Sequence, residues 1–112
     1  MISVIIISHN YGKYLQDCIN SVLNNDPELI KEIILLNDAS SDNTDEVSKK
    51  NLRNNKKIKY FSQNFFSLPK SINFSIKNSS SPWITKIDAD DLIEPFFLKK
   101  FFNYANQNNL DY

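Results

Sequence analysis

The chain has 112 residues, 41% of them hydrophobic, and its 13 Lys and Arg residues balance 13 Asp and Glu residues. This length and apolar content suit one compact domain with a real core, and the even charge argues against binding of nucleic acid through bulk positive charge. A single cysteine, Cys18, and a single histidine, His9, exclude an intramolecular disulfide and a zinc site built from several such side chains.

The first predicted elements are a strand and a helix. Residues 3–8 form a continuous apolar run rich in β-branched side chains, which is typical of a strand buried on both faces of a parallel sheet. Apolar side chains then recur at helical spacing and predict an amphipathic helix over residues 13–25, which Asp-Pro-Glu at 26–28 ends. The apolar positions of this helix are Leu15, Cys18, Ile19 and Val22.

A second strand, a second helix and a third strand follow. Residues 32–37 are another buried apolar run, and a cluster of turn-forming residues comes directly after it. Asn43 and Glu46 then offer a capping box for a short helix over residues 44–54. Residues 57–62 alternate between apolar and polar side chains, which predicts a third strand.

The last third of the chain predicts a loop, a helix, a strand and a final helix. The loop over residues 63–69 leads into a helix that has Pro69 in its first turn. Residues 82–88 predict the fourth strand, and Pro95 should open the last helix. The expected apolar stripe of the third helix is Leu68, Ile72 and Ile76. The expected stripe of the last helix is Phe97, Leu98, Phe101, Phe102 and Ala105.

The regular alternation of strands and helices predicts an α/β fold, a Rossmann-like parallel sheet with helices on both faces. We expect the strand order 3-2-1-4. Polar residues follow every predicted strand, and in open α/β sheets ligands bind at the carboxyl ends of the strands. His9, Asp38 and Asp90 should therefore converge in one cleft.

Four acidic residues stand within seven positions at the end of the fourth strand, including Asp88 and Asp90. These two are two residues apart, so at a strand end both should point to one side. Carboxylate oxygens suit Mg²⁺ or Mn²⁺, and a chain with one glycine, Gly12, has no glycine-rich phosphate loop. A cation shared with a diphosphate would explain the charge. The alternative is that Asp91 and Glu94 only cap the last helix.

Several other residues have both a structural and a functional interpretation. His9 could be a plain surface histidine or could stack on a base. Asp38 could form a turn or accept a hydrogen bond from a base. Lys70 could be a solvated helix residue or reach a phosphate, whereas Cys18 and Trp83 are expected to pack in the core.

In this order, these motifs resemble the nucleotide-binding half of family-2 glycosyltransferases with the GT-A fold. The resemblance rests on three stretches: SVIIISHNYGKYLQDCINSVLNN (3–25), EIILLNDASSDNT (32–44) and LPKSINFSIKNSSSPWITKIDADDLIEP (68–95). It implies a glycosyltransferase that takes its sugar from a nucleoside diphosphate sugar, a UDP-sugar first of all, with Mg²⁺ or Mn²⁺ as cofactor.

The resemblance also implies roles for individual residues. The nucleotide-binding residues would be Ile7, Ser8, His9, Asn10, Asp38, Lys70 and Asp88, and the metal ligands would be Asp90 and Asp88. His9 stands where the family has an aromatic residue, usually Tyr, that covers the uracil. Because of this difference, the identity of the base stays open. Asn37 replaces a frequent Asp, and Ser67 a common Gly.

The resemblance implies no catalytic base in this chain, because the family carries its base and its acceptor site in a second half. We therefore expect residues 1–112 to form a single donor-binding domain that lacks the acceptor half, with an exposed sheet edge where a dimer or a partner could pair. The acceptor, a saccharide or a lipid, stays open. Without a cationic leader or a long apolar segment, we expect a cytoplasmic protein with no transmembrane segment, and attachment to the inner face of the membrane stays open.

Three alternatives stay open. One is a catalytically inactive module that binds a nucleotide sugar. Another is a metal-dependent phosphoryl-transfer domain, although such domains usually carry an acid at the end of the first strand, where this chain has Ser8, His9 and Asn10. The third is a plain interaction domain, which would bind no nucleotide.

Overall fold

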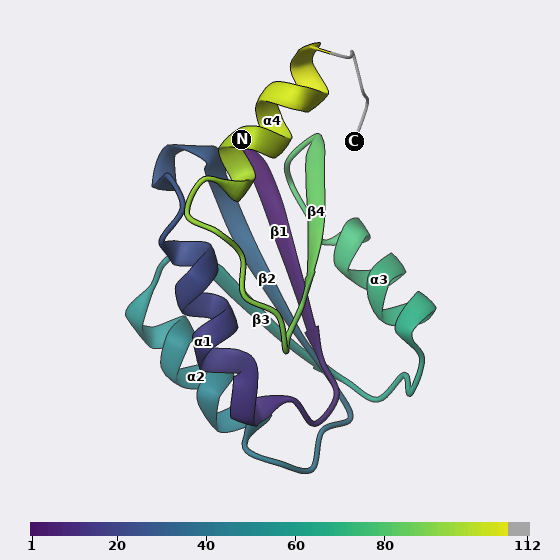
Figure 1. The fold of residues 1–112 in the computed structure, drawn as a ribbon. Coiled ribbons are helices and arrows are strands. Elements are labelled where there is room, and N and C mark those ends of the chain that lie inside the picture. The colour runs from purple at the N-terminus through teal and green to yellow at the C-terminus, as the bar shows by residue number, and fades with distance from the viewer. Residues whose placement is uncertain (108–112) are drawn as a thin grey trace.

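The structure, a computed structural model, describes residues 1–107, in which strands and helices alternate as predicted (Figure 1). The strands are β1 (Ile2–Ser8), β2 (Ile30–Asp38), β3 (Ile58–Gln63) and β4 (Trp83–Asp88). The helices are α1 (Gly12–Leu23), α2 (Thr44–Asn54), α3 (Leu68–Lys77) and α4 (Phe97–Gln107), and a short 3₁₀ turn, η1 (Pro27–Leu29), precedes β2.

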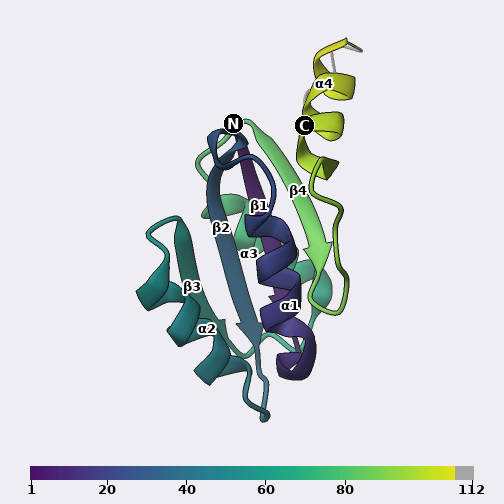
Figure 2. The same cartoon turned by 60° about the vertical axis from the view of Figure 1, so that its left-hand side comes forward.

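The four strands form one parallel sheet in the order β3-β2-β1-β4, which confirms the predicted order. Helices α1 and α2 cover one face of the sheet, α3 covers the other, and α4 lies near the end of the sheet where β1 begins (Figures 1 and 2). Within residues 1–107, β4 has a neighbouring strand on one side only. Because the four strands are parallel, their carboxyl ends meet at one edge of the sheet, which is where ligands bind in such sheets.

The central strand β1 shows why the apolar runs become strands. All seven of its residues are buried. Successive side chains point to opposite faces, so Val4 and Ile6 join the core layer under α1 and Ile5 and Ile7 join the layer under α3. Each face of the sheet is thus covered by one apolar layer, as a strand buried on both sides requires.

Helix α2 begins where predicted, but the predicted capping box is absent. Asn43 takes the N-cap position without a capping hydrogen bond from its side chain. The side chain of Asp42 caps the helix instead, because its Oδ1 accepts hydrogen bonds from the N–H (3.0 Å) and the hydroxyl (2.6 Å) of Thr44. Its Oδ2 accepts one from the N–H of Gly12 (2.8 Å). A single carboxylate therefore joins the starts of α1 and α2.

The apolar stripe predicted for α3 was wrong. Ser71 and Ser75 are completely buried, whereas Leu68 and Ile76 are 52% and 44% exposed. Of the three predicted positions, only Ile72 packs on the core. The small serine side chains lie between the helix and the sheet, an arrangement that a count of apolar residues at helical spacing does not reveal.

Four of the five predicted stripe positions of α4 are confirmed, but Phe97, where the helix begins two residues after Pro95, is 37% exposed. Leu98 and Ala105 are fully buried, and Phe102 packs partly buried with its ring edge against Trp83. None of the helices in residues 1–107 combines the length and the apolar content needed to cross a membrane.

Candidate functional site

Two neighbouring cavities lie at the edge where the strands end. The first has a volume of about 270 Å³ and the second about 300 Å³. Ile7, His9 and Leu68 line both, so the cavities adjoin along a shared wall. The loops after β1, β3 and β4 all contribute to this region, as the alternation of strands and helices predicted.

The first cavity is mainly apolar and has two rings beside it. Its walls are Ile7, His9, Asp38, Phe66, Ser67 and Leu68. The His9 and Phe66 rings meet edge to face with their centroids 6.1 Å apart. The Nδ1 atom of His9 lies 2.6 Å from the carbonyl oxygen of Asp38, and this hydrogen bond fixes the direction of the imidazole ring.

Asp38 organises the loop that follows β3. Its Oδ1 accepts hydrogen bonds from the N–H groups of Phe65 (2.8 Å) and Phe66 (2.9 Å). Its Oδ2 accepts from the N–H of Ser67 (3.0 Å) and the hydroxyl of Ser71 (3.0 Å). Burial alone would raise the pKa of the Asp38 carboxyl, but these four hydrogen bonds outweigh it and hold the pKa below its ordinary value. The ionised carboxylate thus acts as a turn former, and a contact with a base stays a prediction.

Three non-glycine residues near the site have left-handed backbone angles. They are Asn10 (φ 63°), Ala39 (φ 55°) and Phe66 (φ 50°), one in each of the loops after β1, β2 and β3. Asn tolerates this conformation, but for an alanine or a bulky aromatic residue it is strained. Backbone strain of this kind concentrates at functional sites, where the surrounding structure holds it in place.

Three of the predicted nucleotide-binding residues line neither cavity. The hydroxyl of Ser8 is buried, 3.1 Å from that of Thr44. The side chain of Asn10 accepts a hydrogen bond from the N–H of Ser41 at 2.8 Å. Lys70 is exposed in the first turn of α3. Ser8 and Asn10 therefore tie the loops after β1 and β2 together, and their contact with a nucleotide stays a prediction.

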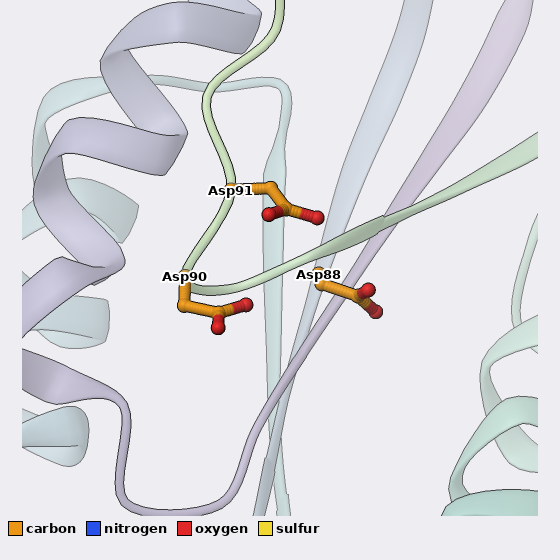
Figure 3. A group of neighbouring side chains, drawn as sticks. All are labelled: Asp88, Asp90 and Asp91. Atoms are coloured by element: carbon orange, nitrogen blue, oxygen red, sulfur yellow. The ribbon is translucent and has the colours of Figure 1, made fainter.

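Asp88, Asp90 and Asp91 form an acid cluster at the second cavity (Figure 3). All three are exposed, and one carboxylate oxygen from each lies within 4.8 Å of the others. Asp88 and Asp90 lie together as predicted, but strand alternation is not the cause, because β4 ends at Asp88. A turn, closed by a 2.9 Å hydrogen bond from the Asp91 N–H to the Asp88 carbonyl, brings the acids together instead.

The acid cluster fits Mg²⁺ or Mn²⁺ in the chemistry of its donors. These cations prefer carboxylate oxygens, and two oxygens bound to one Mg²⁺ lie at most about 4.2 Å apart, twice the metal–oxygen distance. Small rotations of the exposed side chains would therefore suffice to bind one ion. At present the Lys86 ammonium forms an ion pair with Asp88.

The sequence did not identify every residue at the two cavities. Phe66 and Leu68 belong to a segment that was predicted only as a loop and a helix start, yet both line the first cavity. Tyr11 and Lys86 line the second. Lys86 could have been found, because it stands two residues before Asp88 on the same side of β4. The placement of Phe66 depends on hydrogen bonds that its loop donates to Asp38 on a distant strand, which no local pattern shows.

The sequence and fold are similar to those of known glycosyltransferases. An uncharacterised glycosyltransferase of Mycoplasma genitalium is 31% identical over 115 residues, which cover 98% of this chain and 39% of that protein. A structure of S. aureus TarS in complex with UDP-GlcNAc superposes with a TM-score of 0.84 at 25% identity, covering 96% of this chain and 32% of that one. The mannosyltransferase PcManGT of Pyrobaculum calidifontis, in complex with GDP-Man and Mn²⁺, superposes with a TM-score of 0.85 at 14% identity, covering 93% of this chain and 32% of that one. At this low identity, the likeness shows the fold alone.

This chain spans about a third of the length of these relatives. Its parallel sheet and flanking helices confirm the predicted Rossmann-like, GT-A type of fold. The sequence pattern of the family described as Glycosyl transferase family 2 matches residues 3–112, nearly the whole chain. The chain therefore belongs to glycosyl transferase family 2.

Proposed function

We propose that this chain is the donor-binding part of a glycosyltransferase and binds a nucleoside diphosphate sugar, a UDP-sugar first of all, with Mg²⁺ or Mn²⁺. The observation that carries this proposal is that an apolar cavity shares a wall with a cavity lined by Asp88 and Asp90. A nucleoside diphosphate has the same division, with a flat base at one end and a charged diphosphate at the other. The complex of TarS with UDP-GlcNAc supports the choice of a UDP-sugar.

At the nucleoside end, Ile7 and Leu68 provide aliphatic walls, and the rings of His9 and Phe66 provide flat surfaces for the base. Stacking of a base on an aromatic side chain typically contributes about 1–3 kcal/mol. Asp38 acts here mainly by holding the loop that carries Phe66, through its hydrogen bonds to the main chain.

At the diphosphate end, Asp90 and Asp88 would hold the cation. When bound, the cation supplies positive charge that stabilises the departing nucleoside diphosphate. Lys86 lies beside Asp88 and can turn from the carboxylate to a phosphate oxygen. Lys70 lies at the start of α3, the helix whose first residue lines both cavities, where we propose that it faces the donor.

We assign no general base to these residues. Carboxylates that hold a cation are poor bases, because the cation lowers their proton affinity, and His9 belongs to the nucleoside end. The chain spans about a third of its relatives, so we propose that acceptor binding and proton removal lie in another part of a longer protein. The free side of β4 is where such a part, or a second copy, would add strands. Cytoplasmic location stays a prediction.

Calorimetric titration with UDP tests the proposal. We expect binding in Mn²⁺ or Mg²⁺, and binding at least tenfold weaker when a chelator removes the cation. Asp90→Ala should abolish this metal dependence, while Asp17→Ala, on the exposed surface of α1, should not. Equal affinity with and without chelator would remove the metal from the proposal, and no binding in either buffer would favour a plain interaction domain.

A second assay separates a transferase from an inactive donor-binding module. Donor turnover is measured for the 112-residue chain and, if the natural protein continues past Tyr112, for a version extended into that sequence. We expect poor turnover from the short chain, since loss of a general base typically lowers a rate about 10²–10⁴-fold. Robust turnover by the short chain, abolished by Asp90→Ala, would show that the catalytic groups are already present.

A further inference from the structure

Three polar side chains of α1 and its C-terminal turn face the segment that carries the acid cluster. Cys18, Ser21 and Asn25 are three and four residues apart, a spacing that places them on one side of a helix. Cys18 and Asn25 are almost completely buried, with 0% and 2% exposed. The segment of residues 88–98, from the last residue of β4 to the first turn of α4, runs along this side of α1 (Figures 1 and 2).

The first two residues each bind the main chain of this segment. The Cys18 thiol donates to the carbonyl oxygen of Asp88 at 3.4 Å. The Ser21 hydroxyl oxygen accepts a hydrogen bond from the N–H of Ile93 at 3.1 Å, while its own O–H donates to the Cys18 carbonyl at 2.7 Å.

Asn25 makes the largest contribution. Its Nδ2 donates to the carbonyl oxygen of Glu94 at 3.2 Å, and its Oδ1 accepts a hydrogen bond from the N–H of Leu98 at 3.0 Å. A further hydrogen bond from Nδ2 to the carbonyl oxygen of Ser21, at 3.0 Å, fixes the orientation of the amide. One buried side chain thus connects the end of α1 to both ends of the turn that leads into α4.

The segment has few other supports among the described residues. Its internal main-chain hydrogen bonds are those from Asp91 to Asp88 and from Phe97 to Glu94. Ala89 and Leu98 are buried in the core, Ile93 packs partly buried on it, and the exposed carboxylate of Glu94 pairs with Lys100 at 3.8 Å. The acid cluster projects from this segment into solvent, and its three like charges favour separation of the carboxylates. The anchors on α1 oppose that separation.

We infer that Cys18, Ser21 and Asn25 are positioning residues, which hold the acid cluster in the arrangement that captures a divalent cation. This inference rests on the proposed function, because it assumes that Asp88 and Asp90 bind the cation. Residues that orient metal ligands typically change metal affinity 10–100-fold when they are replaced. Asn25 acts on the main chain and not on a carboxylate directly, so we expect a change of about tenfold, at the lower end of this range.

The test compares Asn25→Ala with Asn51→Ala. Asn51 is also a buried asparagine with three side-chain hydrogen bonds, but its partners are Gln16 and Val47, away from the acid cluster. Both variants should lose similar stability in urea. Mn²⁺ affinity is then measured by electron paramagnetic resonance of the free ion, without UDP because free UDP would itself bind Mn²⁺, at a temperature where circular dichroism shows both variants folded. We expect about tenfold weaker Mn²⁺ binding for Asn25→Ala and less than twofold change for Asn51→Ala.

Each result has one meaning. If the wild-type chain does not bind Mn²⁺, the proposed metal site fails. If the wild type binds Mn²⁺ and Asn25→Ala binds equally well, the positioning role is refuted. If Asn51→Ala is weakened as much as Asn25→Ala, the loss reflects general stability and the positioning role is also refuted.

Two further measurements keep the inference testable. Amide hydrogen exchange of the metal-free chain should be faster at Ile93 and Leu98 in Asn25→Ala, and unchanged exchange would contradict the anchoring. If Asn25→Ala does not fold, Ser21→Ala serves in its place, with Ser75→Ala as its control. Ser75 is buried and its hydroxyl has no partner among the described residues. We expect Ser21→Ala to weaken Mn²⁺ binding about threefold and Ser75→Ala to leave it unchanged, and equal affinities would overturn the inference.

Discussion

Replacement of Asp38 by Asn should destabilise the domain and loosen the wall of the nucleoside cavity. The amide keeps the shape of the carboxylate but can accept hydrogen bonds through one oxygen only. If that oxygen keeps its bonds to Phe65 and Phe66, the NH₂ group faces the N–H of Ser67, which loses its acceptor. The hydroxyl of Ser71 can rotate and accept a hydrogen bond from the amide.

The size of the effect follows from these contacts. A buried N–H without an acceptor costs about 1–3 kcal/mol. The remaining hydrogen bonds change from charge-assisted to neutral, and neutral bonds are roughly half as strong. We therefore expect Asp38→Asn to lower the free energy of unfolding by about 2–3 kcal/mol, a large share of the 5–15 kcal/mol that is typical of a domain.

Urea unfolding at pH 7, followed by the fluorescence of the single tryptophan, Trp83, measures this loss. Asp17→Asn is the control, because it makes the same chemical change at an exposed position and should stay within about 0.5 kcal/mol of the wild type. Asp38→Asn should also weaken UDP binding, because the Phe66 loop loses its main support. A free energy of unfolding within 0.5 kcal/mol of the wild type would show that the four hydrogen bonds do not hold this loop.

Three further predictions concern the rest of the domain. Ala39→Gly should raise the free energy of unfolding by about 1 kcal/mol in urea, because glycine removes the strain of the left-handed backbone at φ 55°; a loss of stability would contradict that strain. Gly12→Ala should lower it by about 1–3 kcal/mol, because the new Cβ would lie 2.8 Å from the main-chain nitrogen of Thr44; a neutral result would mean that the start of α2 shifts freely. Burial alone would raise the pKa of Glu32, but hydrogen bonds, first of all from Lys59, lower it to about 2. The stabilisation of the fold by ionised Glu32 is therefore complete above its ordinary pKa near 4.5 and is lost as the pH falls towards 2. The melting temperature of Glu32→Gln should therefore depend less on pH over that range than the melting temperature of the wild type. Parallel curves for the two proteins would refute the lowered pKa of Glu32.

The sheet could be predicted from the sequence because its signals are local. Continuous apolar runs within 3–8 and 32–37 are typical of central strands buried on both faces, and the structure extends them by only a few residues to Ile2–Ser8 and Ile30–Asp38. The alternation of strands and helices then leaves few topologies, so the strand order was predictable as well.

The parts that could not be predicted depend on contacts between distant segments. Asp42 caps α2 in place of Asn43 because it also binds Gly12, 30 residues earlier. Ser71 is buried in α3 because Asp38 binds its hydroxyl. Phe66 reaches the first cavity because the same carboxylate fixes its backbone. In each case one long-range hydrogen bond overrides the local pattern.

The most direct test of a shared site is nuclear magnetic resonance of the isotope-labelled chain with UDP. With Mg²⁺ present, UDP should shift the amide signals of Ile7, His9 and Phe66. When Mn²⁺ replaces Mg²⁺, its unpaired electrons should broaden the signals of residues 88–91 most strongly. Shifts confined to other surfaces, or broadening that leaves residues 88–91 unaffected while UDP binds, would contradict a nucleotide site that joins the His9 cavity to the acid cluster.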